Sequence, residues 1–411
     1  MRVILFTGKG GVGKTTTAAA TAVQAARQGI KTLVMSTDAA HSLGDALGVD
    51  LAAAADCPDP VAEVEVEVEV ESSLYALQLS AAHSVRRSWR SVQDYLLTVL
   101  NSVGVDPVVA EEMTELPGAD EIVALLELRA QIESGPWDLV IVDCAPTAET
   151  LRLLALPEAL AWHLERLMPA QRGLLRRLRP AAAAAAGLPL PELQVMESLR
   201  RWREALQDIR SILTAETTSV RLVLTPERVV IAESRRTLTS LRLYGFAVDQ
   251  IVVNRVFPRA DQESTDTAWL AGWNEAQQRG LSEVRHSFAP LPIVITPYLP
   301  HEPVGADALA ALAQARTGEI RDVMTLAPVP GMTVQPDDEG YLLTLPLPLV
   351  TAAEVDLKRR GDELLVAVGD HRRVLSLPSV LRRCIVMGAT VMGATLRVRF
   401  MPDEKVWPVD D

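Results

Sequence analysis

The sequence predicts an α/β fold with a mostly parallel sheet and helices on both faces, followed by a small all-β sandwich domain. From Met1 to about residue 317, apolar strand-like runs alternate with helical segments, which is the βαβ pattern of a parallel sheet. A glycine-rich turn follows the first of these runs directly. After residue 327, short alternating segments separated by turns replace the helical ones, as in a sandwich. The strand-like runs lie near Val3, Thr32, Leu74, Leu139, Val220, Val248 and Ile293.

The glycine-rich turn, Gly8–Thr15, reads Gly-Lys-Gly-Gly-Val-Gly-Lys-Thr between the apolar run Val3–Phe6 and the alanine-rich stretch Thr16–Arg27. In this strand–turn–helix context the pattern G-x-x-x-x-G-K-[ST] forms a phosphate-binding loop. Successive backbone N–H groups and the helix N-terminus then point at the phosphates. We expect Lys14 to reach the β- and γ-phosphates and the Thr15 hydroxyl to bind Mg²⁺. The predicted nucleotide-binding residues are Gly8, Lys9, Gly10, Gly11, Val12, Gly13, Lys14, Thr15 and Thr16.

A second lysine, Lys9, stands in this loop where the general pattern needs no cation. The string Lys9–Thr15 resembles the deviant loop of the family that includes partitioning ATPases, the nitrogenase iron protein and the ArsA arsenite-pump ATPase. The resemblance implies a P-loop NTPase fold, ATP as the nucleotide, and a homodimer in which Lys9 reaches the partner's nucleotide. There it would act on charge that develops on the phosphates, as an arginine finger does. A solvated surface lysine is the alternative.

Two further segments place acidic residues after predicted strands, where ligands bind in open parallel sheets. Asp38 lies in the segment Ser36–Asp45, and Asp143 opens the segment Asp143–Leu154. The segments resemble the two switch regions of the ArsA and guided-entry (tail-anchored-protein targeting) ATPases. By that resemblance Asp38 positions or activates the attacking water, and Asp143 holds Mg²⁺ through its water shell. An aspartate that caps a helix is the alternative for each.

The switch segments depart from the family pattern at several positions. Ala39 replaces the usual proline of the first switch. In the second switch, Cys144, Ala148 and Glu149 stand where the family has threonine, glycine and histidine. These changes bear on how the nucleotide state is relayed to the rest of the molecule, and the role of Glu149 does not follow from the resemblance. They do not touch the phosphate chemistry.

The last two predicted strands end in residues that match a base-binding pattern. Val248–Val253 runs into Asn254 and Arg255, and the final strand ends at Pro297. In the family, an asparagine after such a strand and a proline-bearing loop cradle the adenine. An amide offers both a donor and an acceptor to a base edge. A strand-end asparagine in an ordinary turn is the alternative.

Composition bounds the class of protein. The length of 411 residues favours two domains, which we place at 1–325 and 333–405. The formal charge of −13 argues against a nucleic-acid-binding face. There is neither an 18-residue apolar run nor a signal-peptide pattern, so we expect a cytoplasmic protein without an integral membrane segment. Cys57, Cys144 and Cys384 lie far apart without a C-x-x-C motif, so no zinc is expected.

Two intervals, 83–133 and 156–216, are too long for simple crossover connections and have helical spacing. Such insertions resemble the helical subdomain that forms the client groove in targeting ATPases, which implies a hydrophobic protein or lipid-like client. An ordinary core is the alternative. Only Met113, Met168 and Met196 fall in the insertions, whereas targeting ATPases line the groove with methionines. The predicted client surface lies on one helix face, at Leu199, Trp202, Leu206 and Ile209.

The C-terminal region begins after a predicted linker, Pro328–Gly331. The run from Val355 to Pro378 resembles the α-crystallin domain of small heat-shock proteins. Its usual Ile-x-Ile docking tail is not found, so large chaperone-like oligomers are not implied. The predicted strands are Tyr341–Leu345, Glu354–Lys358, Glu363–Val368, Arg373–Leu377 and Thr395–Phe400.

The resemblance extends over nearly the whole chain and predicts a Mg²⁺-dependent ATPase that acts as a homodimer. Nucleotide would open and close a helical surface for a hydrophobic client. An arsenite-efflux ATPase is one alternative, although it would need clustered thiols. A nucleotide-loaded scaffold with little turnover is the other, and the set of Lys9, Lys14, Asp38 and Asp143 disfavours it.

Overall fold

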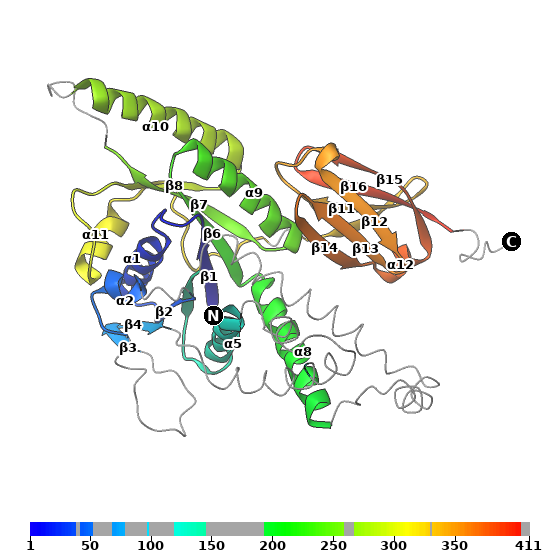
Figure 1. Ribbon diagram of the computed structural model, residues 1–411, viewed down its shortest axis with the longest axis horizontal. Coiled ribbons are helices and arrows are strands. Elements are labelled where there is room, and N and C mark those ends of the chain that lie inside the picture. The colour runs from blue at the N-terminus through cyan, green and yellow to red at the C-terminus, as the bar shows by residue number, and fades with distance from the viewer. Residues whose placement is uncertain are drawn as a thin grey trace.

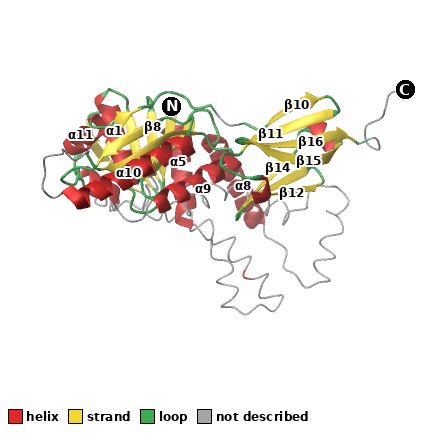
Figure 2. Cartoon of the chain, turned by 90° about the horizontal axis from the view of Figure 1, so that it is seen from above, coloured by secondary structure: helices red, strands yellow, loops and turns green. Residues whose placement is uncertain are grey.

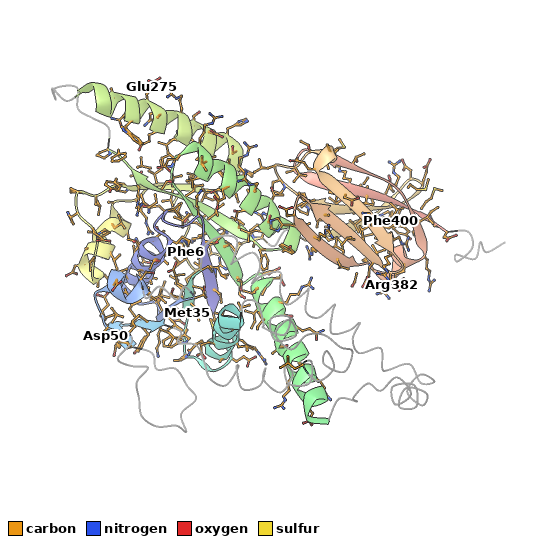
Figure 3. The ribbon with its side chains drawn as sticks, in the orientation of Figure 1. Phe6, Met35, Asp50, Glu275, Arg382 and Phe400 are labelled. Atoms are coloured by element: carbon orange, nitrogen blue, oxygen red, sulfur yellow. The ribbon has the colours of Figure 1, made fainter. Side chains whose placement is uncertain are left out.

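The computed structural model describes residues 1–37, 42–51, 68–78, 97, 119–144, 193–258, 267–328 and 331–403. They form an α/β domain and a small antiparallel all-β domain that lie side by side (Figures 1 and 2). Phe6 and Met35 lie inside the first domain, and Phe400 lies inside the second (Figure 3). The predicted fold class is confirmed.

The α/β domain is built on one sheet with the strand order β3-β4-β2-β5-β1-β6-β7-β8-β9. The strands from β4 to β8 run parallel, and the edge strands β3 and β9 pair antiparallel. Each strand-like run expected from the sequence is a strand of this sheet. The bounds are β1 Arg2–Thr7, β2 Thr32–Ser36, β3 Val68–Glu71, β4 Leu74–Gln78, β5 Leu139–Asp143, β6 Thr218–Leu224, β7 Val248–Val256, β8 Ile293–Pro297 and β9 Thr317–Gly318.

Helices cover both faces of the sheet, because apolar residues alternate along strands that are buried on both sides. In β1, Ile4 and Phe6 pack with the helices of one face, and Val3 and Leu5 pack with those of the other. The first face carries α1 (Lys14–Arg27), α2 (Ser42–Leu47) and α11 (Ala306–Gln314). The second carries α5 (Ala119–Ser134), α8 (Leu193–Leu213), α9 (Arg228–Tyr244) and α10 (Thr267–Phe288). None of the helices in the described ranges combines the length and apolarity needed to span a bilayer.

Strand β1 lies between β5 and β6. After β1 the chain builds the side of the sheet that holds β2 to β5, and it then crosses from β5 to β6 on the other side of β1. Such a change of direction opens a crevice at the carboxyl ends of the strands, where ligands bind in open α/β sheets. Phe6 of β1 and Ser36 of β2 both lie in register with Asp143 of β5. The loop after β1 and the end of β5 therefore meet at one edge of the sheet.

Buried charge gathers at the opposite, amino-terminal edge. Asp249 of β7 forms ion pairs with Arg2 at 3.2 Å and with Arg221 at 3.5 Å. Arg2 Nε also donates to the carbonyl oxygen of Val323, and Arg221 Nη2 donates to that of Arg321. These bonds fasten the segment after β9 to the sheet.

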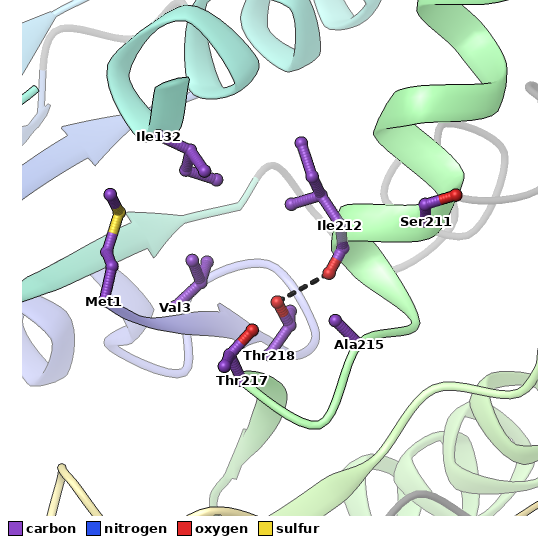
Figure 4. Close-up of a pocket in the computed structure, with 8 residues that line it drawn as sticks. All are labelled: Met1, Val3, Ile132, Ser211, Ile212, Ala215, Thr217 and Thr218. Carbon is purple, nitrogen blue, oxygen red and sulfur yellow. Dashed lines mark hydrogen bonds between the residues drawn. The ribbon is translucent and has the colours of Figure 1, made fainter. Parts of the chain in front are cut away.

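A cavity of about 280 Å³ opens nearby, lined by Met1, Val3, Ile132 and residues around Thr218, whose hydroxyl donates to Ile212 (Figure 4). Because Met1 and the first residues of β1 and β6 border it, this cavity lies away from the phosphate loop.

The β domain is a sandwich of a four-stranded sheet, β10-β11-β16-β15, and a three-stranded sheet, β12-β13-β14. The five predicted strands are present, and two more were missed. Of these, β10 contains Pro336, and β15 carries exposed Ile385, Met387 and Met392 in place of a clean alternation. The bounds are β10 Thr333–Asp337, β11 Gly340–Pro346, β12 Val355–Arg360, β13 Glu363–Val368, β14 His371–Ser376, β15 Cys384–Met392 and β16 Thr395–Pro402, with short helices η1 Ala352–Glu354 and α12 Ser379–Arg382.

The two domains meet at the C-terminal end of α9. Leu243 is fully buried within the core cluster of the sandwich. Arg373 Nη1 donates to the Leu243 carbonyl oxygen at 2.6 Å, and the Thr239 hydroxyl donates to the Pro348 carbonyl oxygen at 2.8 Å. The rings of Tyr244 and His371 meet edge to face, with 6.2 Å between their centroids. The β domain is therefore docked on α9 through specific contacts.

Candidate active site

The phosphate loop joins β1 to α1 and is packed closely against two neighbouring strands. Gly13 is the N-cap residue of α1 and has a φ of 87°, a left-handed conformation that favours glycine. A Cβ atom at Gly8 would collide with the Val223 carbonyl oxygen of β6, and one at Gly13 would collide with the Asn254 amide of β7. All the residues predicted to bind phosphate lie in this loop or in the first turn of α1.

The two lysines of the loop have different surroundings. Lys14 is buried, at 7% exposed, and its ammonium lies 3.5 Å from the Lys9 carbonyl oxygen, within its own loop. The Lys9 side chain is 38% exposed, and its Nζ lies 3.1 Å from Glu233 Oε2 of α9. One cation therefore belongs to the interior of the loop, and the other extends out of it.

Oxygen atoms gather around Asp143 at the end of β5. The Thr15 hydroxyl donates to Asp143 Oδ2 at 2.7 Å, and the Ser36 hydroxyl donates to the same atom at 3.4 Å. Ser42 Oγ lies 3.4 Å from the Thr15 hydroxyl. Mg²⁺ prefers such oxygen ligands and is usually held by one or two carboxylates together with phosphates and water, so this donor set fits it. Sequence reasoning missed Ser36 and Ser42, although both stand in the first switch segment.

Several predicted switch residues lie outside the described part of the chain. These are Asp38, Ala39, Ala148 and Glu149. Thr37, directly before Asp38, is described, and its backbone N–H donates to the Asp143 carbonyl oxygen at 2.9 Å. The catalytic role of Asp38 stays a prediction.

Asn254 braces the phosphate loop. Its side chain is buried, and its Nδ2 donates to the Val12 carbonyl oxygen at 2.8 Å. The amide nitrogen that was expected to read the base therefore holds the loop. Arg255 follows with an exposed side chain and a φ of 56°, and Pro297 pairs with Val256 across β7 and β8.

An aromatic pair that the sequence analysis did not single out lies beside these residues. Phe257 follows β7 and Tyr298 follows β8; both are exposed, with 5.0 Å between their ring centroids. The Gln277 amide holds the Phe257 backbone, accepting from its N–H and donating to its carbonyl oxygen. In the sequence, this pair is indicated by an aromatic residue directly after each of two neighbouring strands. The two rings, inclined at 36°, present aromatic surface at the carboxyl-terminal edge of the sheet.

The predicted client surface on α8 is described only in part. The side chains of Leu199, Trp202 and Leu206 lie outside the description. Ile209 is 1% exposed and packs with Leu213 in the core on the sheet face that α5, α8, α9 and α10 cover. In this structure Ile209 therefore belongs to the core and offers no surface to a client.

Comparison with known proteins identifies the family. A family model for anion-transporting ATPases matches residues 1–317. The chain belongs to the anion-transporting ATPase family. A second model, an HSP20-like domain found in ArsA, matches residues 338–400 of this ATPase, so the β domain is HSP20-like as its sequence suggested. The chain is therefore an ATPase, and the roles of the loop, its two lysines and Asp143 in ATP hydrolysis stay predictions.

This anion-transporting ATPase is similar to proteins of several organisms, two of which are named as ATPases. An uncharacterized protein of Streptomyces coelicolor is 39% identical, over 99% of this chain and 99% of its own. A protein of Chlorobaculum tepidum, provisionally named an arsenical pump-driving ATPase, is 35% identical over 92% of this chain and 90% of its own. ATPase get3 of Aspergillus niger is 28% identical over 75% of this chain and 88% of its own.

Proposed function

We propose that this ATPase depends on Mg²⁺ and works as a homodimer that opens and closes a surface for a hydrophobic client. The contrast between the two loop lysines is the observation that carries the proposal. Lys14 is enclosed in its own loop, whereas Lys9 extends from it and is partly exposed. A cation that its own phosphate cradle does not enclose can serve the nucleotide of a second chain, where it would stabilise developing charge.

The residues of the site divide the work as follows. The loop backbone and Lys14 hold the phosphates, and Asn254 keeps the loop in shape through Val12. Thr15 and Asp143 would hold the metal, which when bound supplies positive charge against the phosphate oxygens. Asp38 would orient the attacking water.

A mixing experiment tests the dimer and the trans role of Lys9. Lys9→Ala chains and Asp38→Asn chains should each be poorly active, because each lacks one group of the composite site. Loss of an oriented acid–base group lowers the rate by about 10²–10⁴-fold. Mixed together, the two variants should recover part of the wild-type rate, since a heterodimer contains one site with both groups. The measurement is phosphate release at equal total protein.

Subunit exchange is the necessary control, shown by pulling down one variant with a tag on the other. If the chains exchange and activity stays at the level of the single variants, Lys9 acts within its own chain and the proposal is wrong. Lys14→Ala is the second control: it should abolish ATP binding, because it removes charge from the ground-state cradle.

The client surface is proposed on the helical insertions. The N-terminal end of α8 points away from the sheet (Figure 1), and the switch segments of the chain resemble those of targeting ATPases. Trp202→Asp should weaken capture of an apolar peptide while leaving ATP affinity intact. Glu197→Ala, an exposed position on the same helix, is the matched control. Unfolding of the Trp202 variant would instead place this stripe in the core.

The described cysteines give no support to arsenite as a ligand. Cys144 and Cys384 are both buried and lie in different domains. Burial raises the pKa of each thiol, for Cys144 with a further contribution from Asp143. Neither thiol is therefore disposed to form the thiolate that binds a soft metalloid.

A further inference from the structure

Helix α9 connects two distant parts of the molecule. Glu233, in its first half, pairs with Lys9 of the phosphate loop. Leu243, in its last turn, is enclosed by the β domain, and Thr239 and Arg373 add hydrogen bonds there. Ten residues of helix separate Glu233 from Leu243, a distance of about 15 Å. Because the far end of α9 is held by the β domain, the Glu233 carboxylate is carried on an anchored helix.

The ion pair between Lys9 and Glu233 forms within one chain. The ammonium lies 3.1 Å from the carboxylate oxygen, so it is held against its own α9. For Lys9 to contact phosphates of a second chain, this pair must loosen. A polyphosphate that approached the paired lysine would also meet the negative charge of Glu233, and like charges at close range repel.

We propose that Glu233 is a positioning residue that holds Lys9 in its own chain until the nucleotide of a second chain displaces it. This inference rests on the proposed homodimer. The competition favours the nucleotide at close range, because a triphosphate carries several negative charges and the carboxylate carries one. Glu233 thus opposes association of the chains when nucleotide is scarce.

The expected magnitude follows from the exposure of the pair. The side chains of Lys9 and Glu233 are 38% and 30% exposed, so water and salt screen their attraction. Pairs of this kind change an equilibrium by about 1.5- to 5-fold. An interaction of this size biases association without blocking it.

The experiment measures association of the full-length chain by sedimentation, with Mg²⁺ and the non-hydrolysable analogue adenylyl imidodiphosphate. Glu233→Gln should lower the dissociation constant of the dimer about 1.5- to 5-fold, because the amide keeps the shape of the side chain and removes its charge. The same substitution in a Lys9→Ala background should have no effect, since no cation is left to hold. Glu283→Gln, which removes an exposed carboxylate from α10, is the matched control and should match wild type.

The outcomes separate the inference from the proposed function. If Lys9→Ala leaves association unchanged, the trans role of Lys9 is wrong and the proposed function fails. If Lys9→Ala weakens association but Glu233→Gln does not strengthen it, only the role of Glu233 is overturned. An equal gain from Glu233→Gln with and without Lys9 would also overturn it, because the effect would then be a general change of charge. A gain confined to chains that keep Lys9 supports the inference.

Discussion

Asn254 illustrates how the neighbours of a single side chain decide its role. The residue stands after β7, where the family resemblance implies contact with the base, yet its amide nitrogen donates to Val12 in the phosphate loop. Gly13 leaves room for this contact, since a Cβ there would strike the amide. This bond uses one N–H of the amide, so contact of Asn254 with the base stays a prediction, and Phe257 and Tyr298 offer aromatic faces nearby.

We expect Tyr298→Ala to weaken ATP binding about 2- to 12-fold, because an aromatic contact is worth about 0.5–1.5 kcal/mol. Calorimetric titration with ATP measures the change. Tyr298→Phe keeps the ring and should bind ATP as wild type does. Equal affinity of the alanine variant would show that the exposed pair does not contact the base.

The local part of the site could be predicted from the sequence, and the tertiary part could not. The loop Gly8–Thr15 and its lysines are consecutive residues, so the phosphate-loop motif can be recognised without knowledge of the fold. The contact of Lys9 with Glu233 joins positions far apart in the chain and depends on how α9 lies over the sheet. The bond between Asn254 and Val12 depends on the order of β1, β6 and β7 in the same way.

Arg2 at the start of β1, Arg221 in the middle of β6 and Asp249 near the start of β7 form one buried charge cluster. Arg2 and Arg221 are almost inaccessible to solvent and both pair with Asp249. Burial lowers the pKa of each guanidinium, although Asp249 opposes this. The cluster connects three strands with the segment after β9, so its ion pairs and hydrogen bonds stabilise the tertiary structure at the edge opposite the phosphate loop.

Asp249→Asn should lower the free energy of unfolding by about 3–5 kcal/mol, because it leaves buried guanidinium groups without their compensating charge. Urea denaturation followed by circular dichroism gives the value. Asp356→Asn breaks an exposed pair with Lys358 and should leave stability unchanged. If the Asp249 variant is as stable as wild type, the charge of Asp249 does not stabilise the buried guanidinium groups as their burial implies.

Strands were predicted where their pattern was regular and missed where it was not. The parallel strands of the α/β sheet are mostly apolar runs, because both of their faces are covered. In contrast, β10 carries a proline, which is tolerated because this strand lies at a sheet edge. Along β15, apolar residues are exposed on an edge strand, so apolar and polar residues do not alternate there in the way that marks a strand.

At the scale of the whole molecule, the docking of the β domain contains a titratable group. His371 of β14 meets Tyr244 of α9 at the junction of the domains. Burial lowers the pKa of His371 below its usual value of 6.5, although Asp370 opposes this shift. A lowered pKa means that the docked state favours the neutral imidazole. The associated stability is complete above about pH 6.5 and is lost as the pH falls through the lowered pKa.

We therefore expect docking to weaken as the pH falls from 7.5 toward 5. Proteolytic cleavage near the linker at 328–331 should become faster over this range, after correction for the pH dependence of the protease. His371→Gln cannot gain a proton and should remove the part of the change that is due to this group. An identical pH profile for the variant and wild type would assign the effect elsewhere.

Leu243 has a consequence for how such chains can be assembled or divided in evolution. The residue is encoded within the ATPase domain, but its side chain completes the interior of the β domain. A gene that lost the second domain would leave a leucine in water at the end of α9, and selection would then favour a polar residue there. The boundary at which the gene can be cut is therefore not the boundary at which the cores separate. Among family members, the residue at this one position should vary with the presence of the second domain.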